Sequence, residues 1–409
     1  HVTGAIPFLN PTHAAYRTTT SSSSSSLSST SPTHPQIYRL WRSRDTRKGR
    51  HALRISTTTS STASTSGTPT SPPPQAHDAE PPKHHHFPVP VITTPQPPTT
   101  HPRIILATLK SMLTTFPYWD LSYLIAVTFT LGSAIWIVNA FFVWLPLQDP
   151  GTVFQGEEGA GGGWTAFVGA AVFEVGSWGL VVEAWGSGQP PSPPPPPSRG
   201  SDTTKAIGNL VLRPSTETCT CHHSNRKGLL SSSSSSGRKK AATATALAGS
   251  SAGAAATTTN TSASRTSKKI NHYLHDLGFL ASLAQLVGAT IFWIAGFTGL
   301  PGILGHMSLP LTDGVYWVPQ VVGGVCFVVS GGLFTLETQE RWDRPAWRVL
   351  GWHIGVWNLV GGIGFTLCGV FGLVGMQYQA CLATFWGSWA FLWASGLQWY
   401  ESLEKWPVE

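Results

Sequence analysis

The chain carries few charges for its length. Of its 409 residues, 11% are Asp, Glu, Lys or Arg, whereas soluble domains carry about 25%. This shortage excludes a soluble globular enzyme. The 5 Cys show no pairing pattern and exclude a disulfide framework. No phosphate loop, nucleophile elbow or His-Glu zinc pair is present either. The sequence therefore predicts no enzyme, no catalytic residue and no cofactor.

Two segments, 1–117 and 186–269, are rich in Ser, Thr and Pro, with runs such as Ser21–Ser26 and Pro193–Pro197. Such segments bury too little apolar surface to offset the entropy of ordering, so we predict that both are disordered. The Arg-rich, acid-poor start has some character of an organelle transit peptide, but we favour a disordered tail. The chain begins with His1 rather than Met, which leaves room for a preceding segment.

The remaining sequence is apolar and holds 17 of the 18 Trp. It divides into six stretches of the roughly 20 residues needed to cross a bilayer, and lipid forces each to be a helix. These stretches lie at 119–145, 164–185, 273–298, 315–336, 349–373 and 381–400. The predicted fold is an all-α polytopic membrane protein, with one hairpin in 118–185 and two in 270–409.

Basic residues mark one side of the predicted membrane. Of the 26 Lys and Arg, eleven precede the first span, eleven lie between the second and third, three between the fourth and fifth, and one follows the sixth. The loops 146–163, 299–314 and 374–380 hold none. Basic residues favour the cytoplasm, so both termini are predicted to be cytoplasmic. The sequon at Asn260 should then carry no glycan.

The even-numbered spans share a pattern: a Phe, two small residues three and four positions later, and a Glu ten positions later. The three sets are Phe173, Gly176, Ser177 and Glu183; Phe327, Ser330, Gly331 and Glu337; and Phe391, Ala394, Ser395 and Glu401. Among the odd spans, Asp120 precedes Gly132 and Asp276 precedes Gly288 by twelve residues, and the fifth span keeps Gly361 without the Asp. These patterns predict three tandem two-helix hairpin repeats.

The repeat acids Glu183, Glu337 and Glu401 have two interpretations. They are solvated residues at helix ends, paired with Arg341, Arg344 or Arg348, or they form a ring at the cytoplasmic mouth of the bundle. The interpretation as solvated helix ends is favoured by default. However, a Glu at a helix C-terminus opposes the helix dipole, and its recurrence three times supports the second.

Glu174 lies near the centre of the second span, where a charge costs about 2.5 kcal/mol or more. Intramembrane acids usually face the interior of a bundle and are candidates for function. Its expected partners are neutral: Asn139, Gln285, Gln320 or Asn358. A structural hydrogen bond and a proton-coupled step remain equal alternatives, and the other two hairpins carry Val328 and Leu392 at this position.

Cys219, Cys221, His222 and His223 lie close together in the second polar segment. Their spacing differs from that of zinc modules, so no metal site is predicted. Palmitoylation of these Cys is an open alternative.

Two runs in the third span and its flanks carry a resemblance. They are HDLGFLAS at 275–282 and VGATIFWIAGFTGLP at 287–301. These runs resemble a group of uncharacterised fungal integral membrane proteins, and the even spans resemble the two-helix YrhK-type membrane domain. The resemblance covers about 270–406 and, more weakly, 118–185. It implies a multi-span protein of fungal source and no particular activity.

The leading functional prediction is a structural or accessory membrane protein, with cytoplasmic tails that bind partners or anionic lipid headgroups rather than nucleic acid. The alternative is a small-solute or proton-coupled transporter or channel that uses Glu174. An enzyme acting on lipid is a third, weaker hypothesis. The expected location is the plasma membrane or an endomembrane rather than the mitochondrion.

Overall fold

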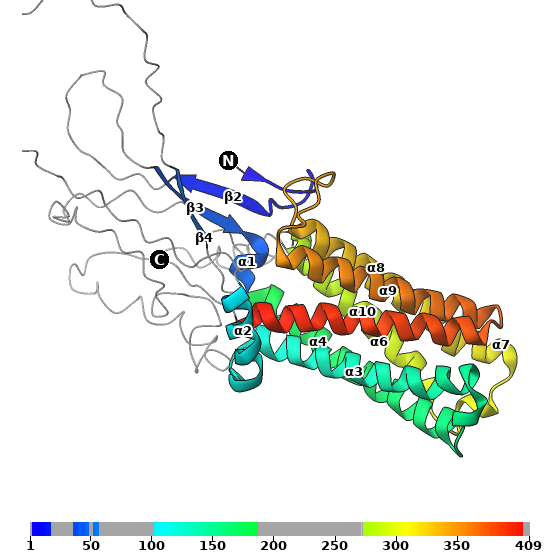
Figure 1. Cartoon of the computed structure of the whole chain (residues 1–409). Helices are drawn as coiled ribbons and strands as arrows, with labels where there is room; N and C mark the ends of the chain where they lie inside the picture. Colours follow the sequence, from blue (N-terminus) through cyan, green and yellow to red (C-terminus); the bar gives the residue numbers. More distant parts are fainter. Residues whose placement is uncertain are drawn as a thin grey trace, which may run out of the picture.

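The computed structural model describes residues 2–17, 36–48, 52–56, 102–186, 271 and 273–403. Within these residues, six long helices form a bundle (Figure 1). They are α3 (Leu121–Gln148), α4 (Gly163–Gly186), α6 (Leu277–Thr298), α8 (Val318–Glu337), α9 (Leu350–Leu373) and α10 (Gln377–Leu403). The predicted all-α membrane fold is confirmed.

Five of these helices are long and apolar enough to cross a membrane. The exception, α10, is 27 residues long but less apolar than the others. Large apolar side chains cover the outside of the bundle, among them Trp178 (57% exposed) and Trp386 (65%). An apolar outer surface of this kind is suited to lipid.

The helices are packed in a closed ring in chain order. Each helix packs against the next one along the chain, and α10 closes the ring against α3. Asp120 and Asp276 act as N-caps of α3 and α6, accepting from the backbone N–H of Ser122 and Phe279 at 3.0 and 2.8 Å. Capping explains the Asp that begins two of the three predicted hairpins.

The two ends of the bundle differ in composition. The end where α3, α6 and α9 begin, called the basic end below, carries every Lys and Arg that the structure describes. Each connection at the other end contains one glycine with positive φ: Gly156, Gly302 and Gly375, at 84°, 85° and 76°. Short connections between helices use glycine at positions with positive φ because residues with a side chain disfavour this conformation.

At the far end, short helical elements lead into the next span. These are η1 (Pro150–Thr152), η2 (Glu157–Gly162), η3 (Leu304–His306), α7 (Leu309–Thr312) and η4 (Asp313–Trp317). The π-helices η2 and η4 run directly into α4 and α8, so these two spans begin with a widened turn.

Parts of 1–117 contain secondary structure where the composition predicted disorder. A four-stranded antiparallel sheet contains β1 (Val2–Thr3), β2 (His13–Arg17), β3 (Gln36–Arg42) and β4 (Ala52–Ser56). The chain also forms α1 (Ser43–Arg47) and α2 (Pro102–Thr114), at the basic end (Figure 1). The physical reason for α1 is that its basic residues contact acids of the bundle. Residues 187–270 lie outside the described residues, so the prediction of disorder there stays a prediction.

Candidate functional site

The three repeat acids, called the acid ring below, lie at the basic end. Glu183, Glu337 and Glu401 come from α4, α8 and α10 and are 3%, 1% and 2% exposed. The interpretation as solvated helix ends was therefore wrong. Each of the three acids lies in the interior of the bundle end, where an unpaired carboxylate is costly.

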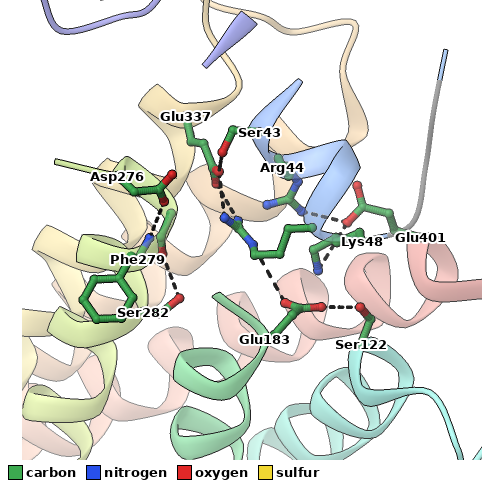
Figure 2. Close-up of polar contacts among 12 residues, drawn as sticks. Ser43, Arg44, Lys48, Ser122, Glu183, Asp276, Phe279, Ser282, Glu337 and Glu401 are labelled. Atoms are coloured by element: carbon green, nitrogen blue, oxygen red, sulfur yellow. Dashed lines mark hydrogen bonds and ion pairs between the residues drawn. The ribbon is translucent and has the colours of Figure 1, made fainter. Parts of the chain in front are cut away.

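Residues 43–48, called the basic segment below, supply the counter-charges. Arg47 donates two hydrogen bonds to the two carboxylate oxygens of Glu337, at 2.8 and 2.7 Å. Arg44 donates to Glu401 at 2.7 Å, and Lys48 Nζ lies 3.7 Å from the same carboxylate (Figure 2). This bidentate pairing of a guanidinium group with a carboxylate is the strongest hydrogen-bond geometry available to such groups.

The remaining acid and the first residue of α1 complete the cluster. Ser122 at the start of α3 donates to Glu183, and Arg47 Nε lies 4.0 Å from Glu183 Oε2. Ser43 donates to Glu337 at 2.9 Å (Figure 2). The acid ring thus presents three carboxylates to three bases of one short segment.

The basic partners expected from the sequence were different. Arg341 pairs with Asp343 at 2.9 Å instead of with a ring acid. Glu183, Glu337 and Glu401 each pair with a base of the basic segment instead. Arg344 and Arg348 are exposed residues of the loop between α8 and α9.

Two glycines make room for the arginines. A Cβ at Gly278 of α6 would collide with the Arg47 guanidinium, and one at Gly351 of α9 would collide with Arg44. Both glycines lie ten residues before the repeat glycines Gly288 and Gly361, and Ser122 occupies the matching position of α3. The ring therefore has two arginine-sized gaps and one serine that donates to an acid.

The pKa values of Arg47 and Lys48 differ from their ordinary values. Burial acts to lower the pKa of Arg47, but the charge and hydrogen bonds of Glu337 outweigh it, so this pKa is raised. Burial lowers the pKa of Lys48, and the charge of Arg44 adds to the effect, against the opposing charge of Glu183. Arg47 is thus the firmly charged member of the segment.

A small cavity lies below the acid ring on the axis of the bundle. Its lining combines Gln285, Asn358 and Gln398 with Glu183 and the basic segment, and apolar side chains close the rest. Its volume is about 30 Å³, enough for about two water molecules. Glu183 Oε2 and Arg44 Nε are buried without a hydrogen-bond partner, and both residues line this cavity.

Deeper in the bundle, aromatic rings fill the axis; they are called the aromatic core below. Its members are Trp136, Phe173, Phe292, Phe327, Phe365 and Phe391. Trp136, Phe292 and Phe365 come from α3, α6 and α9. Their rings contact one another with centroids 5.0–5.5 Å apart. Phe391 meets Phe173 and Phe327 at 5.5 and 6.0 Å. The edge-to-face geometry of most of these pairs is favourable.

The predicted intramembrane polar residues do not form one site. Glu174 accepts from Trp178 at 3.1 Å and from Thr290 of α6 at 3.0 Å, both of them exposed residues. Asn139 donates to the Gly162 carbonyl at 2.6 Å, near the far end. Gln285 and Asn358 line the cavity at the basic end, which neither Glu174 nor Asn139 lines. Gln320 contacts Cys368.

The basic segment was missed by sequence reasoning. The available signal was that a buried acid must be compensated, and basic residues occur in 1–117 as well as in the loop between the fourth and fifth spans. Cys219, Cys221, His222 and His223 lie outside the described residues. No family model, curated protein or solved structure matches this chain, so the resemblance to fungal and YrhK-type membrane proteins stays a prediction.

Proposed function

We propose that this chain is a structural or accessory integral membrane protein, with a bundle that does not conduct solutes. The aromatic core carries the proposal. Six rings from the helices occupy the bundle axis, and a closely packed interior leaves no path for water or ions. We also propose that the basic end faces the cytoplasm, which agrees with the distribution of Lys and Arg.

Anionic lipid headgroups are the proposed partner of the basic end. Arg103, Lys110, Arg341, Arg344 and Arg348 are exposed there, and each basic residue near an anionic surface contributes about 1 kcal/mol of attraction. The three-hairpin origin remains part of the proposal, supported by the equivalent placing of the three Phe and three Glu in the bundle.

The transporter alternative has less support. Glu174 bonds to exposed side chains rather than lining the cavity, and that cavity has room for about two waters. A solute-sized site would need several hundred Å³.

A flux assay tests the proposal. The full chain is reconstituted into liposomes that contain a pH-sensitive dye, and an acid step or a potential is applied. We expect proton entry equal to that of protein-free liposomes, with a protonophore as the positive control. Proton entry that is faster with the wild type and is lost in Glu174→Gln would replace this proposal with the transporter alternative.

A further inference from the structure

We propose that the acid ring is a receptor site for an arginine-bearing polypeptide segment, and that the basic segment occupies it in exchange with such segments from other chains. The ligand class is a short helix with two arginines one turn apart, followed by a lysine. This inference holds whether or not the bundle conducts.

The charge balance of the site requires a cationic occupant. With the basic segment in place, the three carboxylates of the acid ring are each at most 3% exposed, and they lie at the C-terminal ends of three helices. Both burial and the helix dipoles oppose negative charge at these positions. Without an occupant, the carboxylates would have to take up protons or other cations.

The shape of the site selects arginine over other cations. Arg47 lies against Gly278 and meets Glu337 with a bidentate pair at 2.7–2.8 Å. Arg44 lies against Gly351 and donates to Glu401. Planar guanidinium groups fit narrow gaps of this kind and match carboxylates fork to fork, whereas an ammonium group has no planar fork.

Three observations indicate that the occupant is exchangeable. Helix α1 has the sequence SRDTR, so no apolar side chain anchors it. Its fit is also incomplete, because Arg44 Nε and Glu183 Oε2 are buried without a hydrogen-bond partner beside the cavity. Residues 49–101 separate the segment from α2, so no short connection ties it to the bundle on that side.

The test uses a fluorescent synthetic peptide of residues 40–50, LWRSRDTRKGR, and the full chain in nanodiscs. In the receiving variant, Arg44, Arg47 and Lys48 are replaced by Gln, so that its own segment no longer competes. We expect the peptide to bind this variant about tenfold or more tightly than the wild type. Adding Glu337→Gln should abolish the gain, as should replacing the peptide arginines that correspond to Arg44 and Arg47 by lysine.

A glycine pair provides a control that leaves every charge in place. Gly278→Ala narrows the gap at Arg47, so in the receiving variant it should weaken peptide binding. Gly332→Ala on α8, where a Cβ meets nothing within 4 Å, should leave binding unchanged. Equal peptide binding by the wild type, the receiving variant and its Glu337→Gln form would overturn the proposal.

A second measurement covers the case in which the receiving variant does not fold. A protease site is inserted at residue 75 of the otherwise unchanged chain, and the chain is cut after assembly. We expect the N-terminal fragment to stay with the bundle and to be released by excess peptide, but not by a peptide with Gln at the positions of Arg44 and Arg47. Retention of the fragment at saturating peptide would contradict exchange.

Discussion

Glu337 is the most enclosed residue of the acid ring, at 1% exposed, and it makes the closest contact with Arg47. A buried ion pair adds little net stability compared with an apolar pair, but removal of one partner leaves an uncompensated charge. The function of Glu337 is therefore best tested by removing one charge and then both.

The substitution Glu337→Gln should release the basic segment. The docked state should lose about 3 kcal/mol or more because Arg47 would keep its charge without a partner. Amide hydrogen exchange over residues 43–48 should then accelerate by about a hundredfold.

The double variant Arg47→Gln with Glu337→Gln should exchange more slowly than Glu337→Gln alone. Asp343→Asn serves as the control, because this residue belongs to an exposed pair with Arg341, and such pairs contribute little. Unchanged exchange in Glu337→Gln would show that the segment is held by other contacts.

The residues of the acid ring were predictable, whereas their partners were not. The recurrence of a Glu ten positions after a Phe is visible in the sequence, and its conflict with the helix dipole indicates a buried role. Arg44, Arg47 and Lys48 lie in a polar segment whose composition predicts disorder. Only the tertiary contact, about 290 positions along the chain, orders them.

At the scale of the elements, the seam between α8 and α9 depends on close backbone approach. A Cβ at Gly324 would lie 2.7 Å from the backbone N and Cα of Thr366, whereas one at Gly332 would meet nothing within 4 Å. Helices in lipid associate by packing of this kind rather than by the hydrophobic effect.

The substitutions Gly324→Ala and Gly332→Ala should therefore have different effects on the stability of the protein. The first should lower the stability by about 2 kcal/mol, since the backbone of α9 has to move. The second should leave it unchanged or raise it by up to about 1 kcal/mol, because Ala favours the helix more than Gly does. Thermal unfolding in detergent micelles measures both, and equal effects would argue against the observed seam.

Helix α2 is an amphipathic element next to the first span. It has no buried residue, and Leu106 and Leu113 are 70% and 76% exposed. An exposed apolar face at the membrane end of a bundle is suited to the lipid interface. Its 13 residues are too few to span the bilayer.

An environment-sensitive fluorophore at position 113 should report this contact. In liposomes with anionic lipid, a label on Leu113→Cys should show blue-shifted emission relative to one on Thr114→Cys, because successive helix residues point about 100° apart and the two side chains would lie at different depths of the interface. Cys219 and Cys221 are replaced by Ser to limit background labelling. The same emission from both positions would place α2 away from the lipid.

The spans were the most predictable elements because lipid imposes both their length and their helical state. The predicted 349–373 and the observed Leu350–Leu373 differ by one residue. The last helix extends beyond the predicted 381–400 to Gln377–Leu403, since its ends are polar and hydropathy does not mark them. The sheet β1–β4 went unpredicted because Ser and Thr runs dominate the composition around it.

For the molecule as a whole, the aromatic core and the acid ring occupy different depths of one axis. The rings close the bundle in its middle, and the acid ring and the cavity beside it lie at the basic end. The two ends of the bundle therefore differ, and whatever binds the acid ring approaches from the side of the membrane that the basic end faces.

Sidedness can be measured with single cysteines and a membrane-impermeant maleimide in sealed right-side-out vesicles. Gly305→Cys lies in the far connection, where a new side chain meets nothing within 4 Å, and Arg344→Cys lies in an exposed loop at the basic end. With Cys219 and Cys221 replaced by Ser, we expect Gly305→Cys to react in intact vesicles and Arg344→Cys to react only after permeabilisation. The reverse pattern would put the acid ring on the outer surface and exclude cytoplasmic segments as its ligands.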